Sequence, residues 1–229
     1  TLLINRKSCE GKGRTLGSIN IFAGGYGCGK TELALNFAMN TDSKGQDVVL
    51  ADLDLVNPYF VSRQQKAELK AHHVKLLAPF NNLSYGDIPQ LPPQLLAEIQ
   101  RENQLLIDIA GDDTGGLVIG YLHRYLQQRN PVNLWLVINP YRPFAQDLNG
   151  IIELVKLFED ASRLHFTGII SNPHLAEETT VDIIRRGHQQ VLEYAEALQL
   201  KVDYLTVREE FYEQLIPEFG SLLKSIKIY

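Results

Sequence analysis

Ile19-Asn20-Ile21-Phe22-Ala23-Gly24-Gly25-Tyr26-Gly27-Cys28-Gly29-Lys30-Thr31 is the stretch that decides the fold of this chain. Its first part is an apolar run with β-branched residues, which is typical of a buried strand. Its second part is rich in glycine and continues into a segment of helical composition, Glu32-Leu33-Ala34-Leu35-Asn36-Phe37-Ala38-Met39. The stretch therefore predicts a strand, a tight loop and a helix in immediate succession.

The residues from Gly24 to Thr31 read G-x-x-x-x-G-K-T, the pattern of a phosphate-binding loop. Glycines let backbone N–H groups approach a polyphosphate, because they carry no Cβ and accept positive φ. The free N–H groups and the dipole of the following helix also attract anions. We expect Lys30 to bind the β- and γ-phosphates and Thr31 to ligate Mg²⁺. The predicted nucleotide contacts in this stretch are Gly24, Gly25, Tyr26, Gly27, Cys28, Gly29, Lys30, Thr31 and Glu32.

The length and composition of the chain limit the classes of protein to which it can belong. A length of 229 residues suits one α/β domain over 1–229, with 1–17 as an N-terminal edge segment. No apolar run approaches the ~18 residues of a membrane span, and no signal peptide opens the chain, so we expect a cytoplasmic protein. The net charge of -5 disfavours nucleic acid as the main partner. Cys9 and Cys28 have no zinc-site spacing and indicate no disulfide framework.

Acidic residues follow two further predicted strands. Asp52 and Asp54 stand at the end of the predicted strand 47–52, and Asp108 stands at the end of the predicted strand 105–108. Asp108 and Gly111 together form the motif D-x-x-G. The carboxyl ends of strands are where α/β sheets bind ligands. We therefore expect Asp108 to hold Mg²⁺ through water and the Gly111 N–H to sense the γ-phosphate. A solvated acid pair is the alternative for Asp52 and Asp54.

Strands and helices alternate along the whole chain. The remaining predicted strands are 18–23, 74–78, 132–138, 165–171 and 202–207. Helices are expected between them, including 61–71, 95–104 and 117–128, and a last helical region over 209–228. This order predicts an α/β fold of the three-layer P-loop type, with a mostly parallel central sheet and helices on both faces. The apolar residues of 209–228 favour core packing over membrane docking.

Taken together, these motifs resemble the MinD/ParA and CobQ/CobB nucleotide-binding superfamily, a P-loop group that includes nitrogenase iron protein. The resemblance covers about residues 18–229. It implies that Asp54 orients or activates the attacking water with Asp52 beside it, and that Lys30 acts on the phosphates. It also implies that Thr31, Asp54 and Asp108 serve the metal ion. Asn172 would contact the base, and the segment from Val207 to Phe211 would close over adenine.

The chain departs from this family at one position of the loop. Many members carry a lysine where this chain has Gly25, and that lysine reaches across a dimer to the partner's phosphates. An ATP-dependent homodimer is thus left without its lysine contact. Arg14, Arg63 and Arg142 are the candidates to replace that charge, and the sequence does not choose among them.

The end of the strand at Asn172 bears on the choice of nucleotide. Many GTPases carry N-K-x-D there, whereas this chain reads Asn172-Pro173-His174-Leu175 and lacks the aspartate that accepts from guanine. We therefore expect ATP with Mg²⁺ as the bound nucleotide. The favoured function is a MinD/ParA-like ATPase that switches a protein interface. The alternatives are an ATP-dependent ligase of the CobQ/CobB–dethiobiotin type acting on a small carboxylate, and a metallochaperone-type NTPase.

Overall fold

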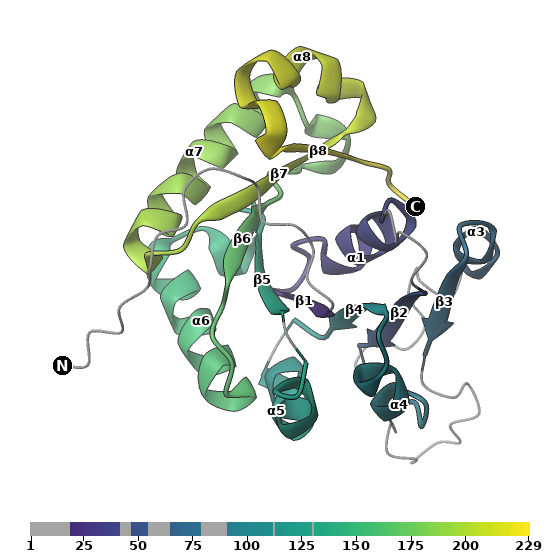
Figure 1. The fold of residues 1–229 in the computed structure, drawn as a ribbon. Helices are drawn as coiled ribbons and strands as arrows, with labels where there is room; N and C mark the ends of the chain where they lie inside the picture. The colour runs from purple at the N-terminus through teal and green to yellow at the C-terminus, as the bar shows by residue number, and fades with distance from the viewer. Residues whose placement is uncertain (1–18, 42–46, 55–64, 79–90, 112, 130) are drawn as a thin grey trace, which may run out of the picture.

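The computed structural model describes residues 19–41, 47–54, 65–78, 91–111, 113–129 and 131–229. Within them, an 8-stranded sheet runs through the molecule in the order β3-β2-β4-β1-β5-β6-β7-β8 (Figure 1). All of its pairings are parallel, which confirms the predicted parallel sheet. The strands are β1 (Ile19–Ala23), β2 (Val48–Leu53), β3 (Val74–Leu77), β4 (Gln104–Ile109), β5 (Val132–Ile138), β6 (Gly168–Ser171), β7 (Val202–Arg208) and β8 (Leu223–Ile226).

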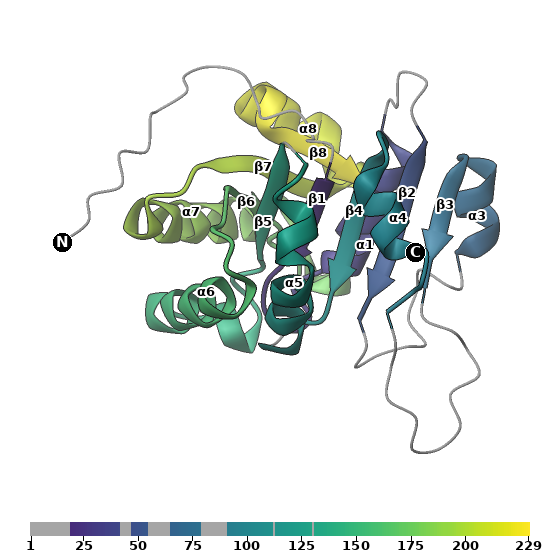
Figure 2. The ribbon, with the colours of Figure 1, turned by 60° about the horizontal axis from the view of Figure 1, so that its bottom comes forward.

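Helices cover both faces of this sheet, as predicted. One apolar cluster joins the sheet to α4, α5, α6 and α7, and a second cluster joins the opposite face to α1 and α3. Figure 2 shows α5 and α6 side by side, and these two helices pack against each other. The helices are α1 (Lys30–Met39), α3 (Lys66–Ala71), α4 (Leu95–Gln100), α5 (Asp113–Leu126), α6 (Leu148–Ser162), α7 (Val181–Leu198) and α8 (Glu209–Phe219), with short 3₁₀ turns at Pro143–Ala145, Ala176–Glu178 and Gly220–Leu222.

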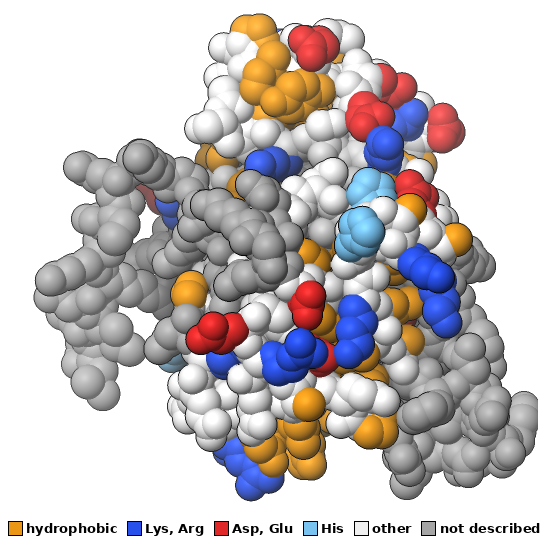
Figure 3. Space-filling model, turned by 45° about the vertical axis from the view of Figure 1, so that its right-hand side comes forward, with side chains coloured by type: hydrophobic (Ala, Val, Ile, Leu, Met, Phe, Trp, Pro, Cys, Tyr) orange, Lys and Arg blue, Asp and Glu red, His pale blue; other side chains and the backbone are white. Residues whose placement is uncertain are grey.

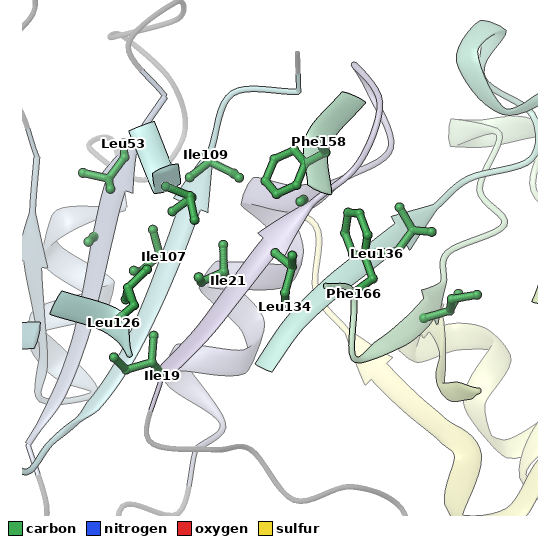
Figure 4. Packing of buried hydrophobic residues seen from close by; sticks show 14 of the residues in the cluster. Ile19, Ile21, Leu53, Ile107, Ile109, Leu126, Leu134, Leu136, Phe158 and Phe166 are labelled. Carbon is green, nitrogen blue, oxygen red and sulfur yellow. The ribbon is translucent and has the colours of Figure 1, made fainter. Parts of the chain in front are cut away.

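The two apolar clusters follow from the alternation of side chains along each strand. Ile19 and Ile21 of β1 point toward the layer of α5 and α6, where Leu134 of β5 lies beside them (Figure 4). Phe22 of β1 and Trp135 of β5 belong to the opposite cluster around α1. Because both faces of the strands are buried, they read as continuous apolar runs in the sequence.

The sheet brings the predicted polar strand ends together. β1 lies between β4 and β5, and β2 lies on the other side of β4. In the pairing of β2 with β4, Asp52 stands opposite Asp108. Since all these strands are parallel, their carboxyl ends form one edge, and the glycine loop after β1 lies at its centre.

The predicted helical region 209–228 was wrong in its second half. Helix α8 ends at Phe219, because Gly220 takes φ 52, which turns the chain out of the helix. The chain then enters β8, an edge strand that pairs with β7. Leu223 and Ile226 are buried at the two ends of this strand and face opposite sides of the sheet. Leu223 packs in the cluster with α7 and α8, and Ile226 packs in the cluster around α1.

Three smaller boundaries also differ from the prediction. The strand expected over 165–171 begins only at Gly168, and the helix expected over 95–104 ends at Gln100. The helix expected over 117–128 begins at Asp113, so Gly115 and Gly116 belong to α5. A Cβ on Gly116 would lie 2.9 Å from Cβ of Ala161 in α6, so glycine allows the two helices to pack closely.

Some of the predicted features lie outside the described residues, and others concern the surface of the molecule. The edge segment 1–17 and residues 61–64 of a predicted helix lie outside the described residues. None of the helices described is both long and apolar enough to cross a membrane. On the face shown in Figure 3, basic and acidic side chains are interspersed.

Candidate functional site

The glycine loop adopts a backbone that only glycine accommodates easily. Gly27 and Gly29 have φ of 73 and 96, in the left-handed region, and Gly24 has φ 151. Gly29 is also the N-cap residue of α1, and no side chain caps that helix end. The first N–H groups of α1 are therefore left for another acceptor, which is the arrangement that binds anions.

Lys30 turns back over the loop from the first turn of α1. Its Nζ donates to the carbonyl oxygen of Gly25 at 3.1 Å, and the side chain is buried. Gly111, beyond the end of β4, approaches the same place: a Cβ built on Gly111 would lie 2.8 Å from Nζ of Lys30 and 3.0 Å from the backbone N of Tyr26. An ammonium group and backbone N–H groups thus converge where we predicted the terminal phosphate.

Asp108 lies beneath this point and is almost fully buried. Burial raises its pKa to about 7, and the neighbouring carboxylate of Asp52 acts in the same direction. A hydrogen bond with Thr31 and the charge of Lys30 oppose this rise in pKa. The structure therefore joins Thr31 and Asp108, two residues predicted to serve the metal ion.

The residues here fit a magnesium ion. Among the described residues, Oδ1 of Asp108 is buried and has no hydrogen-bond partner. A buried carboxylate oxygen without a partner is costly, and a cation beside it would remove that cost. The described residues contain no group of three or more His, Cys, Asp or Glu side chains that could hold a metal. That is expected for Mg²⁺, which binds through one or two protein groups together with phosphates and water.

The two acids at the end of β2 occupy different positions. Asp52 is buried, and its Oδ1 accepts a hydrogen bond from the backbone N of Asp54 at 3.2 Å. Asp54 is half-buried and lines the cavity next to the loop. Asp52 therefore holds the turn, and Asp54 is the acid that faces the place where a ligand would bind.

Asn172, at the end of β6, is tied into the protein by both ends of its amide. Its Nδ2 donates to the carbonyl oxygen of Cys28 at 2.8 Å, and its Oδ1 accepts from the Thr206 hydroxyl at 2.8 Å. A Cβ on Gly29 would lie 2.5 Å from the same Nδ2, so Asn172 packs directly against the loop. The structure thus gives Asn172 a structural task that the sequence did not indicate, and its contact with a base stays a prediction.

The remaining predicted residues divide between the cavity and the interior. Glu32 lines the cavity, and its Oε2 accepts from the backbone N of Tyr229. Cys28 is buried, and burial raises the pKa of its thiol. Val207 is buried in the cluster between α7 and α8, and it pairs with Ser225 of β8 in the sheet. It is not among the residues that line the cavity, and its contact with adenine stays a prediction.

The loop opens into a cavity of about 1080 Å³. One part is formed by the loop, Asp54, Gly111 and the end of β6. Another part includes Arg142, which we named as one of three candidates to replace the missing lysine. It also includes residues that we did not predict, among them Phe144, Glu153, Leu154, Leu157 and His174. The strand end Asn139-Pro140-Tyr141-Arg142-Pro143 was a usable signal, since it follows β5, the immediate neighbour of β1. The α6 residues carried no such signal, because their spacing fits an ordinary amphipathic helix.

No protein-family model and no curated protein matches the chain. Solved structures do match it. The cell division protein FtsY from Thermotoga maritima has a TM-score of 0.54 and 19% identity, over 83% of this chain and 62% of that chain. The signal recognition particle receptor FtsY from Elizabethkingia anophelis has a TM-score of 0.53 and 18% identity, over 91% of this chain and 62% of that chain. The chain thus spans less than two thirds of these FtsY structures.

A second kind of structure matches equally well. FlhF complexed with GMPPNP and Mg²⁺ has a TM-score of 0.52 and 16% identity, over 84% of this chain and 67% of that chain. At these identities the comparisons establish the fold alone, and membership of the MinD/ParA group stays a prediction. The chain has the three-layer α/β fold of the P-loop NTPases.

Proposed function

We propose that this protein is a Mg²⁺-dependent ATPase whose nucleotide state switches an interface with a protein partner. One observation carries the proposal. The Lys30 ammonium and the backbone of Tyr26 and Gly111 meet at the carboxyl edge of the sheet. Asp108 interacts electrostatically with Lys30, and its Oδ1 has no hydrogen-bond partner among the described residues. Backbone donors and a lysine suit a polyphosphate, and an unpaired buried carboxylate suits its cation.

Each residue of the site has its own role in ATP hydrolysis. The glycine loop and Lys30 hold the polyphosphate and offset the charge that develops on it. Thr31 and Asp108 would hold Mg²⁺, which supplies further positive charge to the phosphates. Asp54 faces the cavity and orients the attacking water. The water oxygen bonds to the γ-phosphorus as the bond to the β–γ bridging oxygen breaks, which releases ADP, inorganic phosphate and one proton.

The choice of ATP rests on the end of β6. Leu175 stands where a guanine-selective site has its aspartate, and Asn172 uses both ends of its amide within the protein. FlhF is complexed with the GTP analogue GMPPNP, so GTP is the comparison that the experiment must include. A preference for GTP would correct the base and leave the phosphate site in place.

Thermal unfolding with Mg²⁺ and ATP, GTP or ADP tests the site, and phosphate release tests turnover. At ~100-fold over Kd, a nucleotide should add about 2.7 kcal/mol, which is on the order of 5–10 °C in Tm for a chain of this size. Lys30→Ala should abolish the shift, whereas Lys70→Ala, on the exposed side of α3, should retain it. Failure of the wild-type protein to shift with any nucleotide would overturn the proposal.

A second candidate is an ATP-dependent ligase, and one observation favours it. The cavity continues from the loop to a wall of Phe144, Leu154 and Leu157, whose apolar surface a polyphosphate does not need. Its volume lies at the upper end of small-molecule sites, so it has room for a second molecule. A ligase should release little phosphate until a carboxylate acceptor is added, whereas a switch ATPase should turn over without one.

A further inference from the structure

We infer that Arg142 supplies in cis the positive charge that related P-loop proteins take from a lysine of the partner subunit, and that its guanidinium binds the terminal phosphates. This inference rests on the proposed nucleotide site. It concerns a residue that sequence motifs left undecided among three arginines. Arg14 and Arg63 lie outside the described residues, whereas Arg142 lies in the turn between β5 and the 3₁₀ turn Pro143–Ala145.

The side chain of Arg142 lies against the outer part of the phosphate loop. A Cβ built on Gly27 would lie 3.7 Å from Cδ and 3.8 Å from Nε of Arg142. The side chain therefore crosses the outer part of the loop at Gly27 and lines the same cavity as Lys30 and Thr31. In such a loop the backbone N–H groups cradle the phosphates and the lysine reaches the β- and γ-phosphates. Because Arg142 shares the cavity with Lys30, its guanidinium lies on the side of the terminal phosphates.

Among the described residues, the guanidinium of Arg142 has no hydrogen-bond or ion-pair partner. Nε of Arg142 is buried and, within the described part of the chain, has no hydrogen-bond acceptor. Nor does any carboxylate of the described residues form an ion pair with Arg142. Most buried donors in proteins are satisfied, and an arginine beside a phosphate loop is satisfied most simply by a phosphate oxygen.

The packing of Phe144 against the loop accounts for the glycine at position 25. A Cβ on Gly25 would lie only 3.0 Å from Cβ of Phe144. A lysine there would require Phe144 to move, and Phe144 stands two residues beyond Arg142 on the same turn. The turn that places Arg142 on the loop thus also leaves no room for a lysine side chain at position 25. The charge of Arg142 therefore takes the place of the charge of that lysine.

Steady-state phosphate release and nucleotide binding by Arg142→Gln test the inference. We expect kcat to fall on the order of 10²-fold or more, as for other arginines that contact the transferred phosphoryl group. Affinity should fall most for ATP, less for ADP and least for AMP. Arg142→Lys should restore part of the ATP affinity and little of kcat, because lysine keeps the charge and loses the planar fork. Arg124→Gln, an exposed arginine on α5, is the matched control and should behave as the wild type.

The remaining outcomes separate this inference from its alternatives. Wild-type kcat and ATP affinity in Arg142→Gln would overturn it while leaving the proposed ATPase intact. An equal loss for ATP, ADP and AMP would also overturn it, because it would mark a structural role in the loop. Failure of the wild-type protein to bind any nucleotide would remove the inference together with the proposed function.

Mixing two inactive variants distinguishes action in cis from action in trans. The Lys30→Ala chain still carries Arg142, and the Arg142→Gln chain still carries an intact phosphate loop with Lys30. If Arg142 acts within its own chain, the mixture should stay as inactive as its components at every protein concentration. Recovery of activity in the mixture would show that Arg142 reaches a partner's site and would overturn the inference.

Discussion

Nδ2 of Asn172 donates to the carbonyl oxygen of Cys28 at 2.8 Å, across 144 residues of sequence. This bond fastens the phosphate loop to the end of β6, a strand separated from β1 by β5. The Thr206 hydroxyl on β7 completes the chain of contacts by donating to Oδ1 of Asn172. The geometry of the loop therefore depends on three strand ends at once.

Replacing Asn172 should loosen the loop. Asn172→Ala leaves the Cys28 carbonyl without its donor, so we expect the free energy of unfolding to fall by about 1–3 kcal/mol and nucleotide affinity to fall with it. Thr206→Val keeps the bond to Cys28 and should cost less. Urea unfolding and nucleotide titration measure both effects. Unchanged stability together with altered base preference would show instead that Asn172 serves the base.

Asp108 should stabilise the complex with the metal ion and destabilise the empty protein. Its carboxylate is buried beside Asp52, and within the described structure its Oδ1 has no partner. Asp108→Asn removes the buried charge, so we expect the nucleotide-free protein to gain on the order of 1–3 kcal/mol. The same variant should lose most of the Tm increase that Mg²⁺ and ATP give the wild type. A loss of stability without nucleotide would contradict this account.

A side chain at position 111 should weaken the binding of ATP more than the binding of ADP. A Cβ at this position would lie 2.8 Å from Nζ of Lys30, where we place the terminal phosphate. Gly111→Ala should therefore weaken ATP binding at least 10-fold and change ADP binding much less. Gly220→Ala is the control, since its Cβ meets nothing within 4 Å and its φ of 52 affects stability alone. Equal losses for ATP and ADP would place the effect elsewhere in the loop.

His188 should make the protein less stable in mild acid. Burial lowers the pKa of His188 to about 4, from an ordinary value of 6.5. The ring contacts the Ser171 hydroxyl and the ring of Phe219. The unfolded chain binds a proton at this residue below pH 6.5, and the folded chain binds one only near pH 4. The free energy of unfolding should therefore fall as the pH is lowered through that window, by up to about 1.4 kcal/mol per pH unit.

Urea unfolding from pH 7 to pH 4 measures this dependence. His188→Gln should reduce the slope by about one proton. Identical slopes for the wild type and His188→Gln would refute the assignment.

The sequence by itself determined the parts of this protein that depend on neighbouring residues. The glycine loop, Lys30 and Thr31 were predicted because a strand, a loop and a helix follow one another directly. Asp54 and Asp108 were predicted because parallel strands bring their carboxyl ends to one edge of the sheet. The layers of the fold followed from the same alternation of apolar strands and amphipathic helices.

Only the tertiary structure decided what distant segments do to one another. The edge strand β8 escaped prediction because its apolar residues also fit a helix, and its pairing with β7 settles the matter. Asn36 holds the chain beyond β8 in place, because its Nδ2 donates to the carbonyl oxygen of Lys227 and its Oδ1 accepts from the backbone N of Lys227. These two residues are 191 positions apart in the sequence. The place of Arg142 over Gly27 likewise depends on β5 lying beside β1. Such contacts leave no periodic signal in the sequence, because they depend on the packing of the whole sheet and on no local preference.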